Sequence, residues 1–216
     1  MKDRAKYNQL RFYNKNTCIV FNPIEYSTEE LLNIIASVLD GGIDIIRLQD
    51  TVKAEKLLDL SIKTKQLCAL YDAMFLLDNR VDIAQLSEAD GIFLNAGELD
   101  IISARKILDE TTLIGVSVNT KEDALSAIKN GADYIVLDSI FSTPSNPTFD
   151  TVGLEYAKWV SENIYITAFA EDNIDRLDIS EISQSNITRI SAIYSKETLL
   201  SPVTATEKLI NLTNIK

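Results

Sequence analysis

The sequence reads ADGIF at residues 89–93 and ADYIV at residues 132–136, and a related stretch, GIDII, stands at residues 42–46. Each stretch places an aspartate after a helix-like segment and at the start of a short apolar run. These aspartates, Asp44, Asp90 and Asp133, are 46 and 43 residues apart, which is close to the length of two strand–helix units. This repeated pattern therefore predicts a regular succession of strands, in which each of the three stretches begins an even-numbered strand.

Eight apolar runs of this kind are present, at residues 17–21, 43–48, 74–77, 91–94, 113–116, 134–137, 165–169 and 187–190, and helical segments separate them. The runs are continuously apolar, which is typical of parallel strands covered on both faces. Alternating strands and helices imply right-handed crossovers between parallel strands. We therefore predict an α/β fold, a closed (β/α)8 TIM barrel. The alternative is a flavodoxin-like sheet, but it needs only about five strands and leaves the other runs unexplained.

Local signals mark the helix ends and the domain limits. Ser27-Thr28-Glu29-Glu30 is typical of a capping box, and Gly41-Gly42 predicts the end of the same helix. Thr120 opens another helix, which closes at Asn130-Gly131. We expect residues 1–16 to form an N-terminal extension over the outside or bottom of the barrel, and residues 17–216 to form a single barrel domain.

Composition excludes several classes of function. The chain has 21 basic and 32 acidic residues, a net charge of −11, whereas nucleic-acid binding needs a basic face. It contains no histidine, which excludes Ser-His-Asp and Cys-His catalysis and most zinc sites. Cys18 and Cys68 are interpreted as reduced thiols rather than a disulfide framework. With no apolar run near the ~20 residues of a membrane span and no secretion signal, we expect a cytoplasmic protein without a membrane partner.

Polar residues after the predicted strands are the candidates for chemistry, because barrel active sites lie at the carboxyl ends of the strands. Asp78-Asn79-Arg80 and Glu98 follow neighbouring strands and offer oxygen ligands for Mg²⁺. The structural alternative is that Asp78 or Asn79 caps the helix that begins at Val81.

Two further segments bear on anion binding. Thr143-Pro144-Ser145-Asn146-Pro147 is a hydroxyl-rich loop that suits an oxyanion, or else an ordinary proline turn. Arg47 suits a phosphate, or else pairs with Asp50 or Asp78. Glu171 and Asp172 stand where phosphate barrels carry glycine-rich turns, and their charge opposes an anion there.

Several stretches, read together, resemble one family. They are NRVDIA at residues 79–84, ADGIFL at 89–94, IGVSVNT at 114–120, GADYI at 131–135, FSTPS at 141–145 and GL at 153–154. In order and spacing they resemble the thiamine phosphate synthase family, together with its thiazole tautomerase branch, over roughly Cys18 to Leu212. The resemblance implies the TIM barrel, Mg²⁺ and small phosphorylated pyrimidine- and thiazole-type ligands. The family joins hydroxymethylpyrimidine diphosphate to thiazole phosphate, forming thiamine phosphate and pyrophosphate.

Carried over residue by residue, the resemblance assigns ligand-binding roles with many substitutions. Arg47, Gln49 and Thr51 replace the family's Gln, Arg and Lys. The family's Asn-Asp pair is Asp78-Asn79 in this chain, so neutral Asn79 stands where the family has its first metal-binding carboxylate. Glu98 stands at the position of the second. Ser117, Ile190 and Ser191 match residues that contact phosphate groups in the family. Thr143 and Ser145 match the hydroxyls that contact the thiazole phosphate. Asn146 replaces the lysine that follows them. We expect Asn119 to line the same pocket. The tautomerase branch fits less well, because its histidine would fall near Ser139.

These substitutions predict a transferase of the thiamine phosphate synthase type that works slowly and binds Mg²⁺ weakly. Two other hypotheses stay open: an inactive ligand-binding or regulatory barrel, and a different small-molecule enzyme on the same fold.

Overall fold

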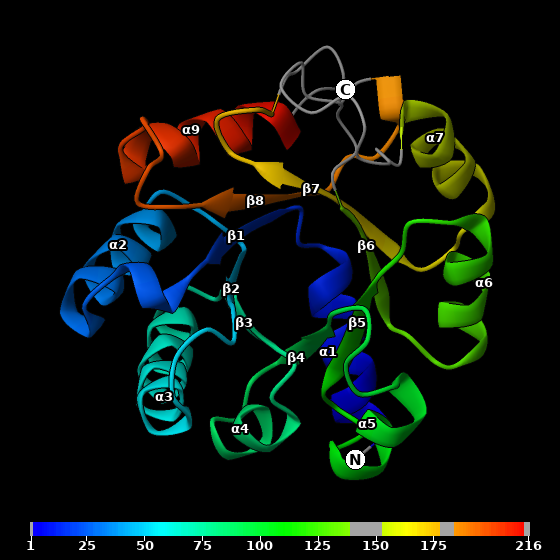
Figure 1. Ribbon diagram of the computed structural model, residues 1–216, viewed down its shortest axis with the longest axis horizontal. Helices are drawn as coiled ribbons and strands as arrows, with labels where there is room; N and C mark the ends of the chain where they lie inside the picture. The colour runs from blue at the N-terminus through cyan, green and yellow to red at the C-terminus, as the bar shows by residue number, and fades with distance from the viewer. Residues whose placement is uncertain (1, 139–152, 178–183, 214–216) are drawn as a thin grey trace.

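The chain folds as a closed barrel of eight parallel strands, in the order β1 to β8, as predicted. The computed structural model describes residues 2–138, 153–177 and 184–213. The strands are β1 (Thr17–Phe21), β2 (Ile45–Leu48), β3 (Met74–Asp78), β4 (Gly91–Leu94), β5 (Leu113–Ser117), β6 (Tyr134–Asp138), β7 (Thr167–Asn173) and β8 (Ile190–Tyr194). Figure 1 shows helices α2 to α7 and α9 around the outside of this ring.

The helical elements cover the barrel in chain order. They are α1 (Lys2–Tyr13), the 3-10 turn η1 (Pro23–Glu25), α2 (Thr28–Asp40), α3 (Ala54–Leu70), α4 (Val81–Leu86), α5 (Ile101–Ile107), α6 (Lys121–Lys129), α7 (Gly153–Asn163) and α9 (Pro202–Thr213). Ser27 and Glu30 form the predicted capping box at the start of α2, and Thr120 caps α6. Gly42 follows α2 with a φ of 98°, a left-handed conformation that glycine adopts without strain.

The repeated aspartates lie at the amino ends of the strands and bind the neighbouring strand. Asp44 Oδ2 accepts hydrogen bonds from the backbone N–H groups of Asn16 (2.8 Å) and Thr17 (3.1 Å) at the start of β1. Asp90 Oδ2 accepts the N–H of Phe75 (2.9 Å) in β3, and Asp133 Oδ2 accepts that of Ile114 (2.8 Å) in β5. The three repeated aspartates therefore have a structural role, since they tie β2, β4 and β6 each to the odd-numbered strand before it.

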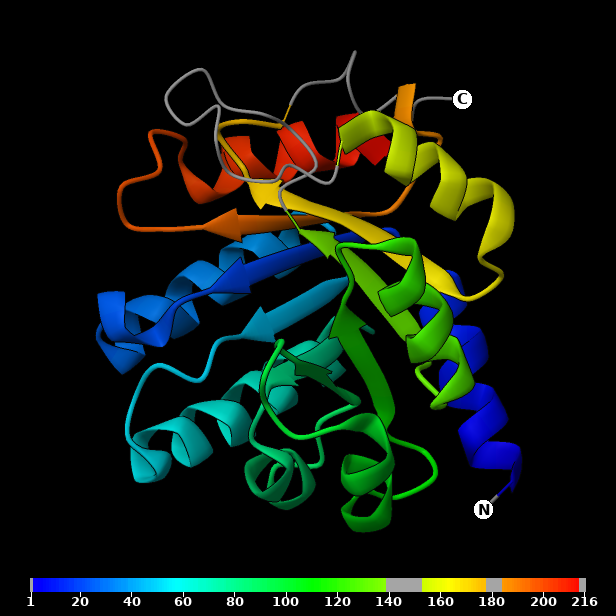
Figure 2. The same ribbon diagram turned by 45° about the vertical axis from the view of Figure 1, so that its right-hand side comes forward.

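Helix α1 closes the bottom of the barrel, at the tail ends of the strand arrows in Figure 2. Its Phe12 is buried, with ring centroids 4.9 Å from Tyr134 and 5.8 Å from Phe169. The Tyr134 ring fills the space beside Gly115, where a Cβ would lie 2.0 Å from Tyr134 Cζ. The Tyr134 hydroxyl donates to the carbonyl of Ile92 at 3.0 Å. The barrel interior is thus packed with aromatic rings at its lower end.

The predicted positions of the last two strands were wrong. β7 begins at Thr167 and continues through Asn173, and β8 begins at Ile190, so both lie later in the chain than predicted. Tyr165, placed in the strand by its apolar neighbours, is 82% exposed. Glu171 extends β7 because its carboxylate turns into the barrel and pairs with a buried cation, which the apolar pattern does not reveal.

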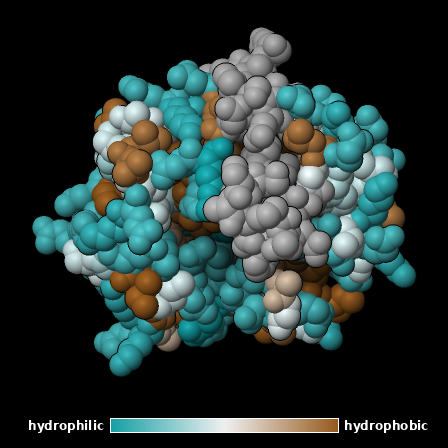
Figure 3. Space-filling view, turned by 45° about the horizontal axis from the view of Figure 1, so that its top comes forward, coloured by the Kyte–Doolittle hydropathy of each residue, from teal (hydrophilic) through white to brown (hydrophobic). Residues whose placement is uncertain are grey.

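The described surface shows no sign of a membrane-spanning element. Among the described residues, no helix is both long and apolar enough to cross a bilayer. On the face shown in Figure 3, most of the coloured surface is hydrophilic, and hydrophobic groups lie in small separate patches.

Candidate functional site

A buried cluster of charged side chains lies at the carboxyl ends of the strands, centred on Arg47 of β2. Arg47 Nη1 and Nη2 each lie 2.9 Å from an oxygen of Glu171 in β7, a forked contact. Arg47 Nε and Asp78 Oδ1 of β3 are 3.1 Å apart, an ion pair not aligned as a hydrogen bond. The side chains of Arg47, Asp78 and Glu171 are only 3, 3 and 7% exposed. One cation therefore joins two carboxylates from opposite parts of the chain.

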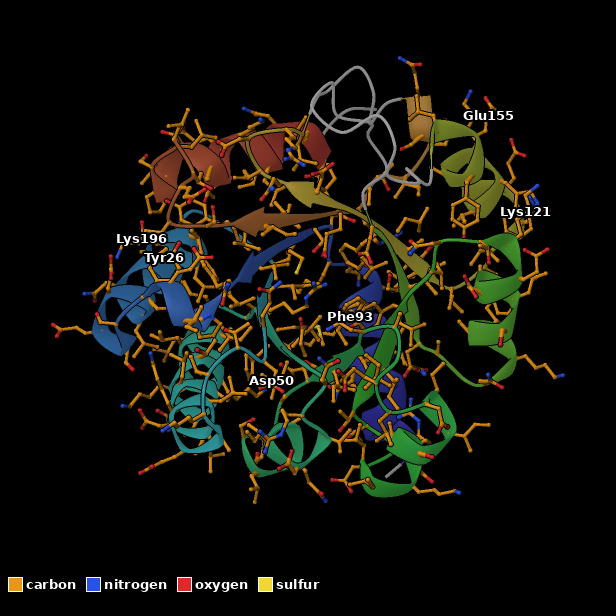
Figure 4. All side chains as sticks on the ribbon, viewed as in Figure 1. Tyr26, Asp50, Phe93, Lys121, Glu155 and Lys196 are labelled. Atoms are coloured by element: carbon orange, nitrogen blue, oxygen red, sulfur yellow. The ribbon has the colours of Figure 1, made fainter. Side chains whose placement is uncertain are left out.

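Neighbouring strands complete the surroundings of this cluster. The Arg47 guanidinium lies 4.1 Å from the ring centroid of Phe93 in β4, a cation–π distance. Figure 4 shows Phe93 inside the ring of strands. The Ser191 hydroxyl of β8 donates to Glu171 Oε2 at 2.5 Å, so Glu171 is fixed from two sides. Cys18 of β1, paired in register with Ser191, lies buried beside them.

A third carboxylate, Asp138, ends β6 beside this cluster. It is paired in register with Glu171 on β7, and its Oδ2 accepts a hydrogen bond from the Ser117 hydroxyl of β5. No salt bridge to Asp138 is found in the part of the chain that the structure describes.

The environment shifts several pKa values. Burial raises the pKa of Asp78 to about 7, with Arg47 opposing and Glu171 adding to the rise. Burial and then Glu171 raise the pKa of Asp138 to about 6. Burial lowers the pKa of Arg47, but Asp78 and Glu171 outweigh it and the net pKa rises, so Arg47 stays charged. Burial raises the pKa of Cys18 to about 12, which keeps its thiol neutral. Asp78 and Asp138 can therefore each gain or lose a proton near neutral pH, as general acids and bases do.

The predicted ligand residues Ser117 and Ser191 lie in this cluster, but their hydroxyls already donate to carboxylates. Arg47 pairs with Asp78, one of the two alternatives expected for it, and also with Glu171. Glu171 was expected to stand in a turn, where its charge would oppose an anion. Its placement in a turn was wrong, because the residue lies within β7 and its carboxylate is paired with Arg47.

Other predicted residues bond to a neighbouring loop or to the backbone, or are exposed to solvent. Thr51 Oγ1 donates to Asn22 Oδ1 at 2.6 Å, and the Gln49 N–H donates to the Phe21 carbonyl at 3.0 Å, so both join the loop after β2 to the end of β1. Asn119 is exposed. The Ile190 N–H donates to the Asn16 carbonyl at 2.9 Å, at the start of β8. Thr143, Ser145 and Asn146 lie outside the described residues.

The residues predicted to bind Mg²⁺ do not fit a metal site. Asn79, at a φ of 58°, uses its Oδ1 to accept the Asn95 N–H (3.0 Å) and side-chain amide (3.3 Å). Glu98 is exposed, and the described residues contain no group of three or more His, Cys, Asp or Glu side chains arranged to hold a metal. The alternative role of Asp78 or Asn79 as a helix cap was wrong, since Arg80 occupies that position and α4 has no side-chain cap.

Sequence reasoning gave no role to Asp138 or Phe93. Asp138 had a signal, since it follows an apolar run as Asp78 does, but its neighbour Glu171 could not be inferred. Phe93 was interpreted only as part of a strand, and its contact with Arg47 depends on the closure of the barrel.

The fold and this site together define a (β/α)8-barrel protein with a charged site at the carboxyl ends of its strands. The family model described as thiamine monophosphate synthase matches residues 17–195. The chain therefore belongs to the thiamine monophosphate synthase family, as the sequence motifs predicted.

Individual relatives agree with this assignment. A thiamine-phosphate synthase of Nostoc punctiforme is 32% identical over 188 residues, covering 87% of this chain and 54% of the relative. One from Shouchella clausii is 32% identical over 166 residues, covering 76% of this chain and 79% of the relative. The structure of a thiamine phosphate pyrophosphorylase from Pyrococcus furiosus superposes with a TM-score of 0.80 at 28% identity, covering 94% of this chain and 97% of that one. The chain spans about half the length of several curated relatives that it matches.

Proposed function

We propose that the mouth of this barrel, the end of the strands that holds Arg47, Asp78, Asp138 and Glu171, binds a small pyrimidine- or thiazole-type ligand and forms thiamine phosphate slowly. The family handles ligands of this kind as phosphates. The reaction would join the pyrimidine to thiazole phosphate and release pyrophosphate. Family membership supports the ligand class, and the charge arrangement at the mouth supports the low rate.

The observation that carries this proposal is the engagement of Arg47. A departing pyrophosphate needs cationic groups that hold it, as other phosphoryl leaving groups do. Arg47 is buried at the mouth, but its two terminal nitrogens, the fork of its guanidinium, already hold Glu171. Its Nε faces Asp78. Arg80, in the next loop, makes its own forked contact with Asp82 at 2.9 and 2.6 Å. A charge-assisted hydrogen bond is worth ~1.5–3 kcal/mol, so a ligand that forms several fewer of them reacts slower by powers of ten.

The acidic groups could still assist part of the reaction. A pyrimidine that loses its diphosphate develops positive charge, and carboxylates at the mouth would stabilise that charge. Asp138, with its pKa raised to about 6, could also take up a proton during the reaction.

For Mg²⁺ we propose weak affinity in the absence of substrate. Asn79 carries no charge and its oxygen accepts two hydrogen bonds from Asn95. We assign the metal no part in the reaction of this chain.

The second candidate is an inactive ligand-binding or regulatory barrel, and the occupied Arg47 fork favours it as well. A different small-molecule enzyme on the same fold is the third. The test is steady-state formation of thiamine phosphate by purified protein with both substrates and Mg²⁺, beside the S. clausii relative as a positive control. A slow but measurable rate supports the proposal. A rate within tenfold of a typical enzyme's ~10 s⁻¹ would contradict slow synthesis, and no product despite ligand binding favours the inactive barrel.

A further inference from the structure

The contact between Arg47 and Glu171 has the geometry with which arginine binds a phosphate. Both terminal nitrogens face both carboxylate oxygens, each at 2.9 Å. Forked contacts of this kind are the usual way in which arginine holds planar carboxylates and phosphate groups. An oxyanion that belongs to the protein therefore occupies the anion-binding edge of the only buried arginine among the described residues.

We propose that Glu171 is a specificity-determining residue: its carboxylate occupies the Arg47 fork in place of a ligand phosphate, so the mouth selects an unphosphorylated, neutral or cationic ligand. This inference rests on the proposed function, in which the mouth binds a pyrimidine- or thiazole-type ligand. It adds that the phosphorylated forms of that ligand, the substrates of the slow synthesis included, bind more weakly than the unphosphorylated forms.

Burial makes Glu171 hard for an incoming anion to displace. The Glu171 side chain is 7% exposed, and Ser191 donates a hydrogen bond to the oxygen that also contacts Arg47 Nη1. A phosphate that took the Arg47 fork would leave a buried carboxylate without its cation, and uncompensated buried charges are strongly unfavourable.

The surrounding charge acts in the same direction. Asp78 and Asp138 lie on either side of the pair, so one guanidinium faces three carboxylates. The segments 139–152 and 178–183, which follow β6 and β7 in the chain, contain no lysine or arginine in their sequence. Those segments cannot contribute a side-chain cation for a phosphate. A ligand with N–H donors or a positive charge matches this mouth better than a diphosphate does.

The test compares two probes that differ only in phosphorylation, thiamine and thiamine diphosphate, by titration calorimetry at matched ionic strength. Wild-type protein should bind thiamine at least tenfold more tightly than thiamine diphosphate. The variant Glu171→Gln should shift this ratio at least tenfold towards the diphosphate, because Arg47 is then held by a neutral group. The control Glu155→Gln removes the same charge from a 94% exposed side chain on α7, at the outer edge of the molecule in Figure 4, and should leave the ratio unchanged.

The possible outcomes separate the inference from the proposed function. Tighter binding of thiamine diphosphate by the wild type would overturn the inference and leave the ligand class in place. A ratio for a folded Glu171→Gln variant within twofold of the wild-type ratio would also overturn it. Binding of neither probe would overturn the proposed function, and the inference with it. The wild-type comparison decides the question even if Glu171→Gln does not fold.

Discussion

Replacing Arg47 with methionine removes the cation that two buried carboxylates share, and should destabilise the protein strongly. Arg47 is 3% exposed, and Asp78 and Glu171 are 3 and 7% exposed. Breaking a buried pair by removing one partner costs about 3–5 kcal/mol, because the remaining charge is uncompensated. That is a large part of the 5–15 kcal/mol that typically stabilises a domain. The same change removes the cation–π interaction with Phe93, at 4.1 Å, which adds to the cost.

The matched control is Arg80→Met. Arg80 makes a similar forked contact, but its side chain and that of Asp82 are 30 and 58% exposed. Surface pairs contribute about 0–1 kcal/mol, so this change should cost little. The free energy of unfolding would be measured by urea denaturation at pH 7.5 for both variants, with circular dichroism as the probe. If Arg47→Met costs no more than Arg80→Met, burial of the pair does not govern stability at the mouth. The double change Arg47→Met with Glu171→Met should recover part of the stability, since it removes one of the unpaired carboxylates.

Three other changes test separate parts of the structure. The pKa of Asp138, about 6 against an ordinary 3.8, means that the folded state holds its proton more tightly than the unfolded state does. Its contribution to stability is therefore present below about pH 4 and lost as the pH rises through about 6. Between pH 4 and 7 the free energy of unfolding of Asp138→Asn should therefore rise by on the order of 2 kcal/mol relative to that of the wild type, as measured by urea titrations. Parallel pH curves for the two proteins would contradict this. Gly115→Ala should destabilise by about 1–3 kcal/mol, because the new Cβ would lie 2.0 Å from Tyr134 Cζ, and an unchanged melting temperature would show that the ring moves freely. Asn79→Asp should strengthen Mn²⁺ binding at least tenfold in water-relaxation measurements, and micromolar binding by the wild type without substrate would refute the weak site.

Local patterns predicted most of the frame. The first six strands carry continuous apolar runs, and their observed bounds lie within two residues of those predicted. The capping box at Ser27 and the cap at Thr120 depend only on neighbouring residues, so sequence spacing is enough to find them.

The rest depends on contacts between distant residues. Glu171 and Arg47 are 124 residues apart, and only the closure of the barrel brings them together. Because Glu171, Asp172 and Asn173 are polar, the pattern predicted a turn where β7 continues. The burial of Glu171 is permitted by its partners Arg47 and Ser191 on other strands, and no local property of the sequence encodes those partners. The same limit applies to Asp138, whose raised pKa is caused by burial and by Glu171 on the next strand.

Part of the family resemblance lies where the frame of the barrel is built, and this part does not fix activity. ADGIF and ADYIV, two of its motifs, place Asp90 and Asp133 at the amino ends of the strands, where they bind neighbouring backbone N–H groups. Residues at that end of a barrel serve stability, whereas those at the carboxyl ends serve chemistry. At the carboxyl ends lies the ion pair of Arg47 and Glu171, which by our proposal takes the place of a ligand phosphate. The two sets of residues lie at opposite ends of the strands, so the mouth can change its ligand while the frame, and with it the family signature, persists.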